Sequence, residues 1–323
     1  MLGRARGLNV NDAIETTNEL LPSAVEGARM LIRRKRRADA HGYPLVMIHG
    51  ATYASSGVFD YPRPDGSWAD LLAGAGFDVW MIDLPGYGQA ERPAAMCRPA
   101  PAHPPLVRTA QAETCAHYAI DHVLAKTGVD KVDLLGYSWG TAIGGAVAGA
   151  KPARINKLVL LGALWIKDVP SAISNGQPPG AYREVSAEDT VKRWCIGLTP
   201  EMANAVGTEA ERRAWAQFTI ESDALARSNG GTLLAPAGVV ADVIEDWAND
   251  KPTYDPGDIR APTLIIMGEW DHETTPAQGR EVFDRLTNAQ DRWFVMIGRA
   301  THSMPLERQR DAMHKAVVNF LRD

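Results

Sequence analysis

The sequence G-Y-S-W-G at residues 136–140 constrains the fold more than any other feature of the chain. It follows the apolar run 131–135 and opens the segment 138–150, which is rich in alanine and glycine and is predicted to be a helix. A G-x-S-x-G sequence between a strand and a helix is typical of a very tight turn that exposes the serine hydroxyl, here that of Ser138. The helix N-terminus behind it favours developing negative charge. The alternative is a glycine-rich turn with an incidental serine.

Short apolar runs recur along the chain and alternate with helical patterns. The runs, most of them closed by glycine, are 44–48, 77–82, 131–135, 155–161, 262–267 and 292–297. Runs of this length are typical of strands buried on both faces of a parallel sheet. Helical periodicity is predicted at 108–126, 276–286 and 306–321. The alternation predicts an α/β fold with a doubly wound, mostly parallel sheet.

One long segment breaks the alternation. Residues 164–260 show no convincing buried strand and are predicted to form several helices, and they hold four of the nine tryptophans. The simplest interpretation is a helical cap inserted into a core that comprises residues 25–163 and 261–323. Residues 1–24 are predicted to be an N-terminal extension.

Composition excludes several classes of protein. A net charge of −5 disfavours a general nucleic-acid-binding protein, and 45% hydrophobic residues disfavour a disordered chain. No apolar run approaches the roughly twenty residues of a membrane-spanning helix, and no apolar signal region follows the N-terminal arginines. Cys97, Cys115 and Cys195 match neither a zinc site nor a disulfide framework. We therefore expect a cytoplasmic protein without nucleic-acid or membrane partners, and the sequence carries no indication of its oligomeric state.

An acid and a histidine follow the last two apolar runs. Asp271 comes shortly after the run 262–267, and His302 shortly after the run 292–297. Open α/β sheets place their reactive groups at the carboxyl ends of the strands. Together with Ser138, these residues give the chain order serine, acid, histidine.

With these motifs the sequence resembles the α/β-hydrolase superfamily, in the form of a serine hydrolase with a helical cap. The resemblance extends from about Val25 to Leu321. Its supporting motifs are His49-Gly50-Ala51, D-L-P-G-Y-G at 83–88, G-Y-S-W-G at 136–140, Gly268-Glu269-Trp270-Asp271 and Ala300-Thr301-His302.

The resemblance implies a role for each site residue. Ser138 is the nucleophile, His302 is the base that takes its proton, and Asp271 orients and stabilises the imidazole. The backbone N–H groups of Ala51 and Trp139 form the oxyanion hole. Chemistry of this kind requires no metal ion and no organic cofactor.

Other residues compete for two of these roles. The competitors are Glu269, Glu273 and Asp168 for the acid, and His272 for the base. Motif position favours Asp271 and His302. His49 is interpreted as a structural residue that shapes the oxyanion turn.

Two charged clusters allow a functional and a structural interpretation. Glu113, His117, Asp121 and His122 have the composition of a metal site, but they mostly fall on the solvated side of the predicted helix. The basic run 33–37 has the composition of a nucleic-acid patch. In an acidic protein we interpret it as a solvated strand near the sheet edge, where basic side chains discourage strand addition.

The expected reaction is acyl transfer to water. We predict a carboxylesterase-like enzyme that hydrolyses an ester, lactone or thioester of a small to medium apolar substrate through an acyl-enzyme on Ser138. Serine in place of aspartate disfavours haloalkane dehalogenases and epoxide hydrolases, and H-G-A-T at 49–52 lacks the HGGPG pattern of proline iminopeptidases. Two alternatives remain: a C–C hydrolase or lyase that uses the same triad, and a ligand-binding protein that retains it.

The substrate pocket is expected between the loop 52–68 and the cap. Tyr53, Phe59 and Tyr61 of the loop are predicted to roof the site, with packing of the loop onto the core as an equal alternative. Trp165 of the cap is predicted to line the pocket. These side chains predict an enclosed and largely apolar site.

Overall fold

A computed structural model of the protein describes residues 14–166 and 171–323. Its centre is an eight-stranded sheet with the strand order β1-β2-β4-β3-β5-β6-β9-β10. The strands are β1 (Glu15–Leu21), β2 (Met30–Arg36), β3 (Leu45–Ile48), β4 (Val79–Asp83), β5 (Val132–Tyr137), β6 (Ile155–Leu161), β9 (Thr263–Gly268) and β10 (Arg292–Ile297). The six strands from β4 to β10 in this order are parallel, whereas β2 is antiparallel to both β1 and β4. The predicted doubly wound, mostly parallel sheet is confirmed.

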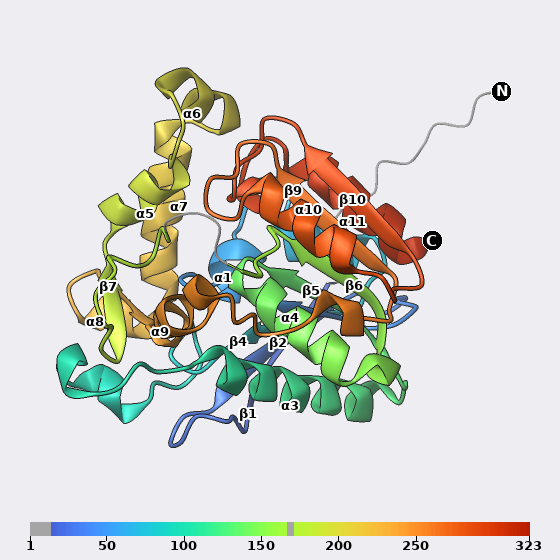
Figure 1. The fold of residues 1–323 in the computed structure, drawn as a ribbon, viewed down its shortest axis with the longest axis horizontal. Helices are drawn as coiled ribbons and strands as arrows, with labels where there is room; N and C mark the ends of the chain where they lie inside the picture. The colour runs from blue at the N-terminus through green and yellow to red at the C-terminus, as the bar shows by residue number, and fades with distance from the viewer. Residues whose placement is uncertain (1–13, 167–170) are drawn as a thin grey trace.

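Helices cover both faces of the sheet, and this explains the continuous apolar runs (Figure 1). Alternate side chains of a strand point to opposite faces. In β3, Val46 and Ile48 enter a core that includes side chains of α3 (Thr109–Thr127), α4 (Trp139–Ala150) and α10 (Pro276–Arg285). Leu45 and Met47 enter a second core with α2 (Trp68–Gly74) and α11 (Arg310–Arg322). Both faces are therefore buried, and every position of β3 requires an apolar residue.

The basic run lies near the edge of the sheet, one strand inside it, but its side chains are ion-paired, and this corrects the interpretation of a solvated strand. β1 is the edge strand and pairs with β2 along its full length. The cations of β2 are held by carboxylates: Arg33 by Asp60, Arg34 by Asp78, and Lys35 by Asp60 and Asp70. Only 8% of Arg33 is exposed. Ion pairing thus allows basic residues to occupy an interior strand, and β1 lies within residues 1–24, the predicted extension.

The four charged residues that composition singles out on α3 take part in three different contacts. His117 lies near Glu113, Asp121 pairs with Arg154, and His122 lies near Glu19 of β1. The positions singled out by composition therefore take part in contacts along the helix and with neighbouring elements.

Between β6 and β9 the chain forms a separate layer of short elements. These are β7 (Tyr182–Val185), α5 (Ala187–Trp194), α6 (Pro200–Val206), α7 (Glu209–Ser222), α8 (Ala224–Ser228), β8 (Leu233–Pro236) and α9 (Gly238–Glu245). Figure 1 shows α5, α6 and α7 beside the sheet, on the side away from α10 and α11. The segment is mainly helical as expected, but β7 and β8 also pair into a small antiparallel sheet. Among the described residues, none of the helices combines the length and hydrophobicity needed to cross a bilayer.

Candidate active site

Ser138 sits in a strained turn between β5 and α4. Its backbone has φ 56° and ψ −121°, a conformation that L-residues rarely adopt. A Cβ on Gly136 would collide with the backbone carbonyl of Gly140, and a Cβ on Gly140 would collide with the carbonyl of Ile48. The turn therefore closes only with glycine at both positions, and this is the physical reason for the G-x-S-x-G pattern.

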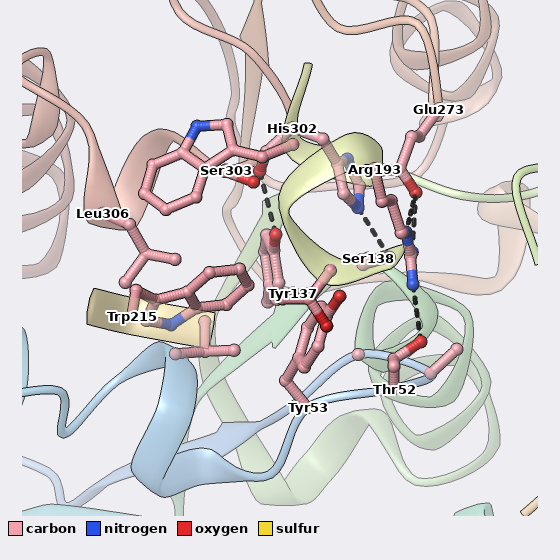
Figure 2. A pocket seen from close by; sticks show the side chains of 15 residues that line it. Thr52, Tyr53, Tyr137, Ser138, Arg193, Trp215, Glu273, His302, Ser303 and Leu306 are labelled. Atoms are coloured by element: carbon pink, nitrogen blue, oxygen red, sulfur yellow. Dashed lines mark hydrogen bonds and ion pairs between the residues drawn. The ribbon is translucent and has the colours of Figure 1, made fainter. Parts of the chain in front are cut away.

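Three predicted side chains form one continuous chain of hydrogen bonds. Ser138 Oγ lies 2.8 Å from His302 Nε2 (Figure 2). On the other side of the ring, His302 Nδ1 lies 2.8 Å from Asp271 Oδ2. The second oxygen of Asp271 accepts the backbone N–H groups of Glu273 and Thr274, each at 2.9 Å. The Asp271 carboxylate accepts a hydrogen bond from the Nδ1–H group, so Nε2 is free to accept the serine proton.

The surroundings of His302 favour its protonated form. Burial by itself lowers the pKa of His302, but the charges of Asp271 and Glu273 outweigh it and raise this pKa above its ordinary value of 6.5. A more basic imidazole removes the serine proton more readily. The competing base His272 is exposed.

The backbone of His302 is also anchored. The Tyr137 hydroxyl donates to the His302 carbonyl oxygen at 2.9 Å, and the two rings are 5.2 Å apart. Burial raises the pKa of Tyr137 well above 10, so its hydroxyl keeps the proton that it donates. Of the competing acids, Glu269 accepts the Arg299 N–H at the surface, and Asp168 lies outside the described residues.

The predicted oxyanion residues flank Ser138. Trp139 is the first residue of α4, where helix geometry leaves N–H groups without an intrahelical partner. On the other side, a Cβ on Gly50 would stand 3.0 Å from Ser138 Cβ, so the loop that carries Ala51 passes close to the serine. His49 accepts the Leu84 N–H at Nε2 and contacts the Gly50 carbonyl through Nδ1 at 2.7 Å. These bonds suit the structural role expected of His49.

Two small cavities meet at Ser138. The first has about 20 Å³ of space open to the centre of a water molecule, and its lining includes Tyr53, Trp194 and Trp215. The second has about 40 Å³, and its lining includes Leu164 and Val243. A single water needs about 10–15 Å³ by this measure, so each cavity holds only a few waters.

Of the four predicted pocket residues, only Tyr53 lines a cavity at Ser138. Phe59 is fully buried in the core against Trp68, and Tyr61 packs edge-on against Phe218. Trp165 donates its indole N–H to the carbonyl of Tyr254. Each of these rings serves packing, because core neighbours of suitable shape lie beside it.

The structure places an arginine in the site that the sequence analysis did not single out. Arg193 of α5 donates through Nε and Nη2 to Glu273 Oε2, at 2.8 and 2.6 Å, and through Nη1 to Thr52 Oγ1 (Figure 2). The ion pair is largely buried, with 15% and 10% of the two side chains exposed. Its partners are distant in sequence, so no local spacing signals the arrangement.

Comparison with known proteins places this architecture in a family. Residues 43–308 match the family model for the alpha/beta hydrolase fold, and the chain belongs to that family. It is similar to two proteins named 2-hydroxy-6-oxononadienedioate/2-hydroxy-6-oxononatrienedioate hydrolase. The one from Cupriavidus pinatubonensis is 26% identical and the one from Dechloromonas aromatica 29%, and each match covers 86% of both chains. The solved 2-hydroxy-6-oxo-6-phenylhexa-2,4-dienoate hydrolase of a Rhodococcus species shares the fold, with a TM-score of 0.61 and 18% identity over 96% of this chain and all of that one.

These relatives overturn the prediction of a carboxylic ester hydrolase. The compounds in their names carry a hydroxyl group, a ketone and two carboxylates, but no ester, lactone or thioester. The alternative interpretation, a C–C hydrolase that uses the same triad, is better supported. Hydrolase chemistry on a small molecule is supported under either interpretation.

Proposed function

We propose that the protein hydrolyses a carbon–carbon bond in a 2-hydroxy-6-oxo-dienedioate or a close analogue. The observation that carries the proposal is the hydrogen-bonded chain of Ser138, His302 and Asp271. It occurs in a protein similar, over most of its length, to hydrolases named for such compounds.

The named compounds dictate which bond water must break. Without an ester, hydrolysis at the C6 ketone has to cleave a bond between C6 and carbon. Ketonisation of the 2-hydroxyl group moves a proton to C5, and the C5–C6 bond then breaks with its electron pair passing along the conjugated chain to the oxygen on C2. For the nonadienedioate, carbons C6 to C9 leave as succinate.

The site residues supply the remaining steps. Ser138 attacks C6 while His302 takes its proton, and Asp271 stabilises the resulting imidazolium. The backbone N–H groups of Ala51 and Trp139 hold the negative oxygen, and each such donor contributes about 3 kcal/mol to transition-state stabilisation. The His302 imidazolium gives its proton to the departing dienolate, and the neutral imidazole then takes a proton from the water that releases the acyl group from Ser138.

The segment 164–260 acts in this proposal as the cap, and residues 25–163 and 261–323 as the core. Its contribution to the site is supported by Arg193 and Trp194 of α5 and by Trp215 of α7, which line the cavity at Ser138. Core residues supply the reacting groups, and cap residues enclose them.

The proposal is tested by incubating the purified protein with 2-hydroxy-6-oxononadienedioate. We expect the absorbance of the conjugated substrate to fall and succinate to appear in equal amount, with neither change in Ser138→Ala. A fluorophosphonate probe reports independently whether Ser138 is reactive. Labelling of Ser138 without any consumption of the dienedioate would contradict the proposal.

A further inference from the structure

A large groove adjoins the proposed active site and has no part in the mechanism above. It has about 590 Å³ of space open to the centre of a water molecule, within the range of about 300–1,000 Å³ typical of ligand sites. The loop 172–180, β7 and α5 supply much of its wall, and Arg193 lines both this groove and the two cavities at Ser138. The groove therefore borders the small reaction space and offers room for the bulk of a substrate.

Arg183 of β7 lies between the groove and the loop that carries Ala51, called here the oxyanion loop. It lines the groove, and its Nη2 donates to the Ala51 carbonyl at 2.9 Å and to Thr52 Oγ1. Its Nε is buried and has no hydrogen-bond partner. Among the described residues Arg183 forms no ion pair, whereas Arg193 pairs with Glu273.

The charges near Arg183 do not balance. Two guanidinium groups, those of Arg183 and Arg193, lie near a single carboxylate, that of Glu273. Burial and the nearby charge of Arg193 lower the pKa of Arg183 to about 10, so the group is still cationic at neutral pH. Arg183 is partly buried, and a cation withdrawn from water without a counter-ion is destabilising, a cost that an anionic ligand reduces.

The acidic residues of the groove do not neutralise Arg183. Asp189 accepts hydrogen bonds from the backbone and the hydroxyl of Ser186 at the start of α5. Glu184 is exposed, as is the basic Lys192. The inner end of the groove thus presents an unpaired cation close to the oxyanion loop.

We propose that Arg183 binds the terminal carboxylate on the acyl side of the substrate. The proposal rests on the proposed function and names the group that selects its substrate. Arg183 bonds to the carbonyl of the residue whose N–H holds the C6 oxygen, so its ligand must lie near C6. In the nonadienedioate, the C9 carboxylate is three bonds from C6 and the C1 carboxylate is five. The C9 carboxylate is the one nearer to C6, so it is the carboxylate that fits Arg183.

The first test compares the dienedioate with an analogue in which a methyl group replaces the C9 carboxylate. We expect the wild type to favour the dienedioate by about 30-fold in kcat/KM, the scale of a buried charge pair. Arg183→Gln should reduce this preference to about 3-fold or less, and Arg183→Lys should leave an intermediate value. Arg227→Gln, at an exposed arginine of α8 that lines none of these cavities, should keep the wild-type preference. An equal loss on both substrates in Arg183→Gln, or no preference in the wild type, would overturn the proposal.

The second test does not depend on turnover. We expect 10 mM succinate, but not uncharged succinamide, to raise the Tm of the wild type by about 2 °C or more and to leave Arg183→Gln unchanged. If neither substrate is hydrolysed but succinate stabilises the protein through Arg183, the proposed function fails and the anion site stands. If the dienedioate is hydrolysed and neither the preference nor the succinate effect depends on Arg183, the anion site fails alone. Absence of both turnover and succinate binding overturns both.

Discussion

The Ser138 turn and the opposite wall of the cavity are built from different kinds of contact. This wall, called here the cap wall, consists of Arg193 and its partners Glu273 and Thr52. The turn is local: its conformation depends on two glycines within residues 136–140 and on the backbone of β3 beside them. The wall is assembled over long sequence distances, since Arg193 bonds to Glu273, 80 residues away, and to Thr52, 141 residues away. The position of the Ser138 hydroxyl is thus encoded by local backbone geometry, whereas the wall around Arg193 depends on contacts formed only in the folded chain.

The largest effect is expected at the local turn. Ser138→Ala removes the nucleophile without changing the backbone, so kcat on the dienedioate should fall by about 10⁴-fold or more while stability changes little. Steady-state kinetics and urea unfolding measure the two quantities. Ser228→Ala, on the surface of α8, serves as the matched control and should match the wild type. Activity within 10-fold of wild type in Ser138→Ala would assign the nucleophile elsewhere.

At the cap wall, a substitution should mainly lower the free energy of unfolding. Glu273→Gln leaves Arg193 as an uncompensated, largely buried charge, so the free energy of unfolding should drop by about 3 kcal/mol. Urea denaturation measures the change. The double variant Arg193→Met with Glu273→Met should recover most of it, because no buried charge is then left alone.

An exposed pair of the cap provides the control for this change. Arg213 and Glu209 are both more than half exposed, so Glu209→Gln should cause no measurable change. Equal responses at Glu273 and Glu209 would remove the distinction between the wall and the cap surface.

A smaller effect is expected at another hydrogen bond between the segment 164–260 and the rest of the chain. Trp194 of α5 donates its indole N–H to Glu307 at 2.9 Å, and Glu307 also accepts the backbone N–H of Thr301, next to His302. Trp194→Phe should cost about 1.5 kcal/mol of unfolding free energy, the scale of a buried hydrogen bond to a charged or polar acceptor. Trp293→Phe, which removes a similar bond to Asp291 at the surface, should cost less in the same thermal or urea assay.

The smallest effect concerns pH. His302 acts as a base only when unprotonated, so kcat/KM should rise with pH through a pKa above 6.5. Glu273→Gln removes one of the charges that raise this pKa, so the acid limb should move to lower pH. Glu269→Gln, on the other side of Asp271, should leave the limb in place. A limb that does not respond to Glu273 would mean that the wall has no electrostatic influence on the base.

Local sequence signals predicted the central strands of the sheet and the three residues of the candidate triad. β3, β5 and β9 are buried on both faces, so they appear as apolar runs that periodicity identifies. β1 has no such signal, because an edge strand with mostly exposed side chains is polar along its length. β7 and β8 are only four residues long, which is too short for a pattern to emerge.

The residues of the pocket and the class of reaction could not be predicted from local sequence. Aromatic residues such as Phe59 and Trp165 suit a core and a pocket equally, and only their packing neighbours distinguish the two. Ester and C–C hydrolysis begin with the same attack on a carbonyl carbon, so Ser138 and His302 do not reveal which bond to that carbon breaks. That choice belongs to the substrate and to the cap that selects it.

The bond from the Tyr137 hydroxyl to the His302 carbonyl has a mechanical consequence. Tyr137 immediately precedes Ser138, so the serine and histidine segments are joined at two points, one between two side chains and one from the Tyr137 side chain to the His302 backbone. A single link would act as a pivot and let the imidazole swing about it. Two links restrict that rotation, so the histidine loop and the turn behave as one rigid frame.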